Sequence, residues 1–217
     1  RVALLSGDIG NRMYDKFKET CPGRFFNCGV AEANMTGVAA GMALCGLRPF
    51  TYTITPFVTT RCLEQIRVDV CYHKAPVTIV AVGAGYSYAT LGATHHACED
   101  IAFLRALPGM KVICPGDAVE VREAVKAILQ QDSPVYLRLG KKGEPVVHTE
   151  IPEFEIGKGI IIKEGTDACL LNTGITLPIS LEAGLELGKR GISTKVVNLH
   201  TVKPLDEELL SSVFSNF

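Results

Sequence analysis

The sequence lacks features that would assign it to several large classes of protein. Its 22 Lys and Arg nearly balance its 23 Asp and Glu, and the basic residues form no stripe, which argues against a nucleic-acid partner. No uninterrupted apolar run reaches the roughly 20 residues that a membrane-spanning helix requires. No Cys-x-x-Cys pair occurs, and no His stands at ligand spacing from a Cys, so we expect no structural zinc site.

The eight cysteines are scattered along the chain, and several of them lie inside apolar runs. We therefore expect buried free thiols in a reducing environment, which places the protein in the cytoplasm. No signal-peptide pattern opens the sequence, and its first residue is Arg1. We expect that residues preceding Arg1 are missing.

Short apolar runs alternate with helical patterns over the first 140 residues. The expected strands cover 2–6, 48–54, 76–82, 111–114 and 134–139, and a further short buried strand begins at Phe25 and turns at Gly29. The expected helices cover 12–19, 30–43, one long amphipathic helix over 58–72, 98–106 and 118–131. This alternation predicts an α/β fold with a parallel sheet and right-handed crossovers.

A stretch rich in Lys, Gly, Pro and Glu then interrupts the pattern, and a second α/β unit follows. Its expected strands cover 167–172 and 194–199, and its expected helices 175–190 and 204–214. We predict one domain over 1–140, a linker over 141–155 and the first part of a second domain over 156–217. Because the second unit has so few strands, we expect truncation or disorder beyond Phe217.

One acid, Glu32, opens the predicted helix that follows Gly29, and no basic residue follows it within three turns of that helix. Burial raises the proton affinity of a carboxyl, whereas a helix N-terminus lowers it. If burial dominates, Glu32 can give or share a proton; the alternative is an exposed first-turn residue that complements the helix dipole. The expected apolar stripe of this helix consists of Ala31, Met35, Val38 and Met42.

Residues 83–96 form a second stretch of interest. They are rich in glycine and hydroxyl side chains, have no hydrophobic periodicity, and end in the pair His95 and His96. Loops of this length inside a compact domain are usually functional. We therefore expect this loop to contribute to a site.

Several motifs follow one another along the chain: residues 26–35, 55–61 with 64–67, 92–96 with Glu99 and Asp100, 136–140, and 172–174. Together they resemble the C-terminal half of transketolase, and most closely the separately encoded C-terminal subunit of split transketolases. The resemblance extends over essentially the whole chain. It implies a thiamine diphosphate enzyme that transfers a two-carbon ketol unit between sugars, with a pyrimidine-binding domain over residues 1–140.

The resemblance also implies roles in binding the cofactor. Glu32 would hydrogen-bond a ring nitrogen of the aminopyrimidine, which favours the imino tautomer that takes the proton from the thiazolium carbon. Phe57 would pack on the pyrimidine ring, although plain core packing is the alternative. Ile54 and Thr60 stand where other transketolases carry further aromatics of the same pocket, and Val30 lies in the first motif beside Glu32.

On the substrate side, the resemblance makes His95 the histidine that faces the reacting carbons, and His96 takes the place of a common Gln. The alternative for both is a loop histidine bonded to nearby backbone. Arg138 and Lys141 are candidate phosphate ligands, although Arg138 equally suits a structural cation within the sheet.

Two departures concern the substrate. Leu91 stands where the family has an acid, and neither the His nor the Arg that the family places near Gly83 is present. Tyr86 and Tyr88 lie nearby in the sequence instead. An ordinary sugar phosphate would therefore lack two of its family contacts in this chain.

The family motif Gly-Asp-Gly, which holds the diphosphate and Mg²⁺, does not occur here. We therefore expect a partner subunit that carries it, in a homodimer-like or α2β2 heterotetrameric assembly with the cofactor between subunits. Two alternatives remain: the beta subunit of a 2-oxo acid dehydrogenase, or a non-catalytic assembly or regulatory subunit of a thiamine enzyme.

Overall fold

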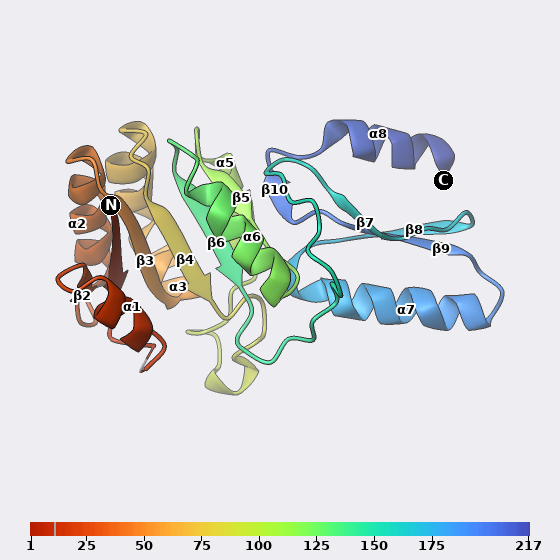
Figure 1. Cartoon of the computed structure of the whole chain (residues 1–217), viewed down its shortest axis with the longest axis horizontal. Coiled ribbons are helices and arrows are strands. Elements are labelled where there is room, and N and C mark those ends of the chain that lie inside the picture. The colour runs from red at the N-terminus through yellow and green to blue at the C-terminus, as the bar shows by residue number, and fades with distance from the viewer. Residues whose placement is uncertain (11) are drawn as a thin grey trace. The chain divides into compact units, whose positions relative to one another are not determined.

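A computed structural model describes residues 1–10 and 12–217 of the chain (Figure 1). The chain packs into two compact units. Unit 1 comprises Arg1–Lys111 and Leu129–Lys141, and unit 2 comprises Val112–Ile128 and Lys142–Phe217. Residues 112–128 thus pack with the C-terminal part of the chain. The domain boundaries predicted from the sequence place them in the first domain, over 1–140, and these boundaries stay a prediction.

Unit 1 is built on a parallel sheet whose strands follow the spatial order β6-β4-β3-β1-β2. Every neighbouring pair in this order is parallel, which confirms the predicted α/β fold. All five residues of β4 are buried, as expected for a continuous apolar strand inside a parallel sheet. The strands are β1 (Val2–Ser6), β2 (Phe25–Asn27), β3 (Arg48–Ile54), β4 (Thr78–Val82) and β6 (Val135–Leu139).

The helical segments of unit 1 are shorter than predicted. They are α1 (Asp15–Thr20), α2 (Glu32–Leu44), α3 (Thr55–Val58), a 3₁₀ turn (Thr60–Cys62), α4 (Leu63–Gln65), a π-helix (Ile66–Tyr72), a 3₁₀ turn (Ala89–Leu91) and α5 (Asp100–Ala106). The helix predicted over 58–72 is present from Thr60 to Tyr72, but as a run of 3₁₀, α and π turns rather than one α-helix, and it begins after a break at Thr59. Thr59 leaves the helical region at φ −113° and ψ −80°, and its hydroxyl donates to the carbonyl of Thr55 at 2.6 Å. This side-chain bond competes with helix continuation.

The buried face of α2 differs from the expected apolar stripe. Met35 is fully buried as predicted, but Val38 is 41% exposed and Ala31 is exposed. The buried residues of the helix are Glu32, Met35, Thr36, Ala39, Ala40 and Ala43. Small side chains on this face let α2 pack closely against β3, so the carboxylate at its start faces inward with them.

Unit 2 contains a three-stranded sheet of order β7-β9-β8, in which β8 is parallel and β7 antiparallel to β9. In addition, β10 pairs antiparallel with β5. The sequence pattern did not predict β7 or β10. The strands are β5 (Lys111–Ile113), β7 (Ile160–Lys163), β8 (Ala168–Asn172), β9 (Thr194–Asn198) and β10 (Thr201–Lys203).

The helices of unit 2 are α6 (Ala118–Ile128), α7 (Leu177–Lys189), which follows a 3₁₀ turn (Gly174–Thr176), and α8 (Glu207–Asn216). The side chain of Asp206 caps α8 by accepting a hydrogen bond from the amide of Leu209. In the part of the chain that the structure describes, none of the helices is both long and apolar enough to cross a membrane.

All eight cysteines are free thiols, as the sequence analysis expects. Only Cys62, Cys71 and Cys114 are buried, whereas Cys45 and Cys98 are exposed. Burial raises the pKa of the Cys62 thiol, and the nearby charge of Glu32 adds to this shift. This thiol therefore stays protonated at neutral pH and packs as a small apolar side chain.

Candidate functional site

Glu32 is the first residue of α2, after the turn that leaves β2, and it is only 2% exposed. Gly7 follows β1 and lies close to it, since a Cβ added there would be 3.3 Å from Glu32 Cγ. The exposed first-turn alternative is therefore wrong. The structure places a carboxylate inside unit 1, beside the ends of its strands.

Arg61 is the cation that pairs with this carboxylate. Its Nη1 donates to Oε2 of Glu32 at 2.7 Å, and its side chain is 44% exposed. Arg61 lies 29 residues from Glu32 in sequence, so the pattern of charges along the helix does not indicate it, although Arg61 is the last residue of the motif over 55–61. Because Arg61 reaches water, a ligand that replaces it at Glu32 does not leave a buried unpaired cation.

Phe57 and His95 continue the same cluster. The guanidinium carbon of Arg61 lies 4.3 Å from the centroid of the Phe57 ring, within the range of a cation–π contact. The ring of His95 meets Phe57 edge to face, with centroids 5.1 Å apart. Glu32, Phe57 and His95 come from α2, α3 and the loop before α5; Arg61 joins Glu32 to Phe57, and the Phe57 ring contacts His95 directly.

Tyr88 and Lys141 extend the cluster beyond His95. The Tyr88 ring lies 6.1 Å from that of His95, and the Lys141 ammonium lies 5.0 Å from the Tyr88 centroid. A Cβ added at Gly83 would be 2.2 Å from Tyr88 Cε2, so Tyr88 fills the space beside Gly83. Burial raises the pKa of Tyr88, and burial together with Tyr88 raises that of Tyr52 to about 12. Both phenols therefore remain protonated at neutral pH.

The other predicted site residues lie differently. His96 Nε2 is 3.2 Å from the carbonyl oxygen of Ala89, which is the backbone contact of the alternative interpretation. Val30 is 75% exposed, Thr60 is exposed, and Ile54 is half-buried at the end of β3. The cofactor and substrate roles assigned to these residues stay predictions.

Arg138 is held by Asp100, the first residue of α5. Its Nε donates to Asp100 Oδ2 at 2.6 Å and its Nη2 to Oδ1 at 3.2 Å. Nη2 also donates to the carbonyl of Ala97 at 2.9 Å, and the hydroxyl of Tyr136 donates to Asp100 as well. These contacts are those of a structural cation, and a phosphate-binding role for Arg138 stays a prediction.

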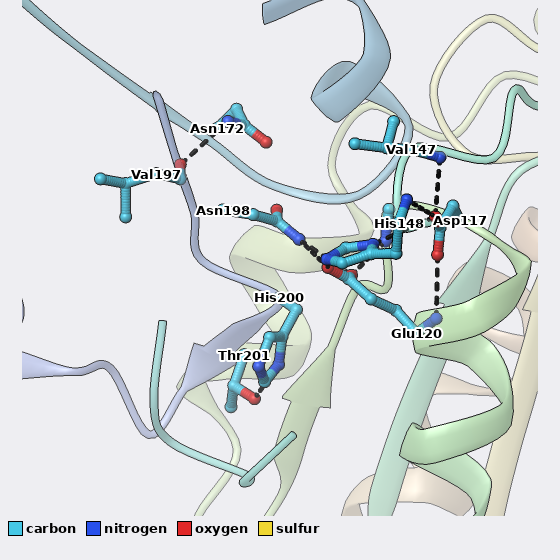
Figure 2. A network of polar contacts seen from close by, with 10 residues as sticks. Asp117, Glu120, Val147, His148, Asn172, Val197, Asn198, His200 and Thr201 are labelled. Carbon is cyan, nitrogen blue, oxygen red and sulfur yellow. Dashed lines mark hydrogen bonds and ion pairs between the residues drawn. The ribbon is translucent and has the colours of Figure 1, made fainter. Parts of the chain in front are cut away.

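Unit 2 contains a separate network of buried acids, which Figure 2 shows. Asp117 accepts the amide of Glu120 at 2.9 Å, which caps α6. Its other oxygen accepts the amides of Val147 and His148 at 2.9 Å and lies 3.1 Å from Nδ1 of His148. Burial alone would raise the pKa of Asp117, but these hydrogen bonds outweigh burial and lower it.

Glu120 lies at the centre of this network (Figure 2). It accepts the Gly116 amide at 2.6 Å and the side-chain amide of Asn198 at 2.7 and 2.8 Å. Burial raises the pKa of Glu120, against the effect of these donors. The network ties the start of α6 to residues far along the chain, so its arrangement points to a structural role.

His200 is fully buried beside this network. Its ring stacks on Phe154 with centroids 3.9 Å apart, and its Nδ1 lies 3.0 Å from the hydroxyl of Thr201. Burial, and then the nearby His148, lower its pKa to about 4. Neither histidine has a motif around it, and Phe154, which stacks on His200, and Asp117, which bonds His148, are distant from them in sequence.

Comparison with known proteins identifies the family. Residues 2–144 match the transketolase pyrimidine-binding domain, and residues 157–216 match the transketolase C-terminal domain. The chain is 40% identical over 209 residues to the 6-deoxy-6-sulfo-D-fructose transketolase subunit of Clostridium sp. (strain MSTE9), covering 96% of this chain and 65% of that protein. It is 36% identical over 210 residues to a subunit of the apulose-4-phosphate transketolase of Phocaeicola vulgatus, covering 96% and 67%.

Solved structures agree with this match. A split-gene transketolase, described as an inactive β4 tetramer, superimposes with a TM-score of 0.90 at 38% identity, over 99% of this chain and 70% of that chain. Transketolase from Campylobacter jejuni, at 21% identity and a TM-score of 0.85 over 99% of this chain and 34% of its own, shows the same fold. The chain spans about two thirds of the length of the relatives it matches. It belongs to the transketolase family.

Proposed function

We propose that this chain is the pyrimidine-binding subunit of a thiamine diphosphate-dependent, transketolase-like enzyme that moves a two-carbon ketol unit between sugars. The observation that carries the proposal is Glu32, a buried carboxylate that Arg61 and Phe57 connect to His95. The relatives support the reaction class, and their names mention two different sugars. The sugar that this chain accepts is therefore left open.

The residues of the cluster fit the aminopyrimidine end of thiamine diphosphate. A carboxylate that is 2% exposed can hydrogen-bond a ring nitrogen away from competing water. Phe57 offers an aromatic face, which Arg61 covers in this structure, to another flat ring. Since Arg61 is half exposed, its guanidinium can give way to such a ligand.

When bound, the cofactor supplies the electron sink for breaking and forming a carbon–carbon bond. Glu32 would hold the pyrimidine end and control the proton on its ring nitrogen, and Phe57 would orient the ring. Thr94 Oγ1 lies 2.9 Å from Nδ1 of His95, so we assign Nε2 of His95 to the oxygens of the sugar. Tyr88 and Lys141 lie next along the cluster, where they would meet the rest of the substrate.

We assign the diphosphate and Mg²⁺ to a second polypeptide, because the Gly-Asp-Gly motif is absent from this sequence. The description of a split-gene transketolase as an inactive β4 tetramer supports a requirement for a second kind of subunit. An α2β2 heterotetramer would provide this second subunit, and a homodimer of this chain is the alternative assembly. We place this assembly in the cytoplasm, on the evidence of the free cysteines.

The test is Glu32→Ala in the enzyme reconstituted with its diphosphate-binding partner. We expect ketol transfer to fall by about 100-fold or more and the thermal shift caused by thiamine diphosphate to shrink. Glu64→Ala is the control, because Glu64 is exposed and pairs with Arg67 at the surface. Unchanged transfer in Glu32→Ala would falsify the proposal.

The same preparation distinguishes the alternatives. Reduction of dichlorophenolindophenol with a 2-oxo acid, without ketol transfer, would identify the beta subunit of a 2-oxo acid dehydrogenase. A wild-type complex that assembles but shows neither activity would identify an assembly or regulatory subunit.

A further inference from the structure

The loop that carries His95 is closed at its base by a pair of hydrogen bonds. The amide of Gly85 donates to the carbonyl of Ala97, and the amide of Ala97 donates to the carbonyl of Gly85, both at 3.0 Å. Residues 86–96 lie between them. Since His95 is two residues from this bridge, a shift of the bridge displaces its imidazole.

Arg138 connects the bridge to the sheet. It lies on β6, where it is paired in register with Ala81 of β4. Its Nη2 donates at 2.9 Å to the same Ala97 carbonyl that accepts the Gly85 amide. One side chain thus joins a strand inside a parallel sheet to the base of the loop.

Asp100 fixes the orientation of that side chain. Its two oxygens receive Nε and Nη2 of Arg138 at 2.6 and 3.2 Å, and the hydroxyl of Tyr136 donates to the same carboxylate. The side chains of Arg138 and Asp100 are only 11% and 2% exposed. A two-pronged, charge-assisted pair of this kind is strong and directional, and separating it would leave a buried charge unpaired.

We infer that Arg138 is a positioning residue for His95, acting through Ala97, and that Asp100 and Tyr136 hold it in place. This inference rests on the proposed function, because it takes His95 as the group that meets the substrate. In this inference Arg138 positions His95 and does not bind a substrate phosphate. Its Nε and Nη2 are directed at Asp100 and at the loop base, and the ring that they position is 5.1 Å from Phe57.

The test compares three variants of the full chain. Arg138→Lys keeps the charge but loses the fork, and Tyr136→Phe removes one hydroxyl donor. Arg48→Lys is the matched control, since Arg48 also lies on a strand of this sheet and pairs with an aspartate, Asp132, which is exposed. Amide hydrogen exchange over residues 86–96 and the NMR signals of the His95 ring are measured without cofactor.

In Arg138→Lys, exchange in the loop should speed up by about tenfold, because the opening of the loop no longer breaks the forked bond. The signals of His95 should shift. Tyr136→Phe should move both readouts in the same direction by a smaller amount, and Arg48→Lys should move neither. If Arg138→Lys does not fold, Tyr136→Phe decides.

Kinetics of the reconstituted enzyme then separate positioning from general loosening. For Arg138→Lys we expect kcat to fall by about tenfold, since a misplaced catalytic group slows the chemical step. The concentration of thiamine diphosphate needed for half activity should stay within about twofold. Unchanged loop exchange and His95 signals, or equal effects in Arg48→Lys, overturn the inference. Because those two readouts need no cofactor, they do not depend on the Glu32 test.

Discussion

The molecule contains two buried glutamates, each in the first turn of a helix, whose partners differ in kind. Glu32 in unit 1 is 2% exposed and pairs with Arg61, a cation that is itself half exposed. Glu120 in unit 2 is fully buried and accepts hydrogen bonds from a backbone amide and from Asn198, and its Oε1 lies 3.5 Å from Nε2 of His148, whose side chain is 9% exposed. The partner of Glu32 can turn into solvent, whereas the donors to Glu120 are buried and cannot move away from it.

This difference separates an acid available to a ligand from an acid that supports the fold. Fixed neutral donors satisfy a carboxylate permanently, and removing it leaves them buried without an acceptor. A partner at the surface can return to water at little cost. The Phe57 ring lies against the half-exposed Arg61, where a flat ligand could use it. The His148 ring beside Glu120 is instead largely buried and held by Asp117.

The largest expected effect on stability comes from Glu120→Ala. It removes the acceptor of Gly116 and Asn198 and opens a cavity, so we expect a loss of about 3 kcal/mol in the free energy of unfolding. Glu32→Ala also opens a cavity, but it leaves no buried donor unpaired because Arg61 can turn to solvent, so its loss should be smaller, about 1 to 2 kcal/mol. Urea unfolding of both variants measures the two values. Equal losses would contradict the distinction between the two glutamates.

A second, pH-dependent effect should arise in unit 2 from His200. Burial lowers its pKa to about 4 in the folded chain, whereas an unfolded histidine titrates near 6.5. Between these values the unfolded chain binds the proton and the folded chain does not. Stability therefore decreases as the pH falls from about 6.5 to about 4, by up to about 3 kcal/mol.

Urea unfolding at several pH values between about 4 and 7.5 tests this dependence. His200→Gln should flatten the curve over that window, because the variant has no imidazole to protonate. His73→Gln is the control, since His73 is exposed. An unchanged slope in His200→Gln would contradict the assignment of this dependence to His200.

Local patterns sufficed to predict much of unit 1. The strand over 48–54 has the bounds predicted from its β-branched and aromatic residues, and the continuous apolar run before Gly83 is the buried strand β4. The motifs also indicated Glu32, Phe57 and His95, which the structure brings into one cluster. Such features depend on neighbours in sequence, which periodicity and motif spacing record.

The remaining features depend on residues that are distant in sequence. Arg61 pairs with Glu32 across 29 positions, and Asn198 bonds Glu120 across 78. The antiparallel strands β7 and β10 depend on pairing with β9 and β5, and the buried side of α2 was set by close packing on β3 rather than by its larger apolar residues. Tertiary contacts decided these points, and local propensity does not determine them.

The smallest expected effect tests whether exposure of a partner is the property that matters. Arg67 makes a two-pronged contact with Glu64, but the two side chains are 59% and 65% exposed. Arg67→Ala should therefore change the free energy of unfolding by no more than about 0.5 kcal/mol and leave ketol transfer unchanged. Urea unfolding and the assay of the reconstituted enzyme measure both. Arg67→Ala could instead lower ketol transfer as much as Glu32→Ala is expected to. Burial of the carboxylate would then not explain the loss of activity in Glu32→Ala, because a change at an exposed ion pair would have the same effect.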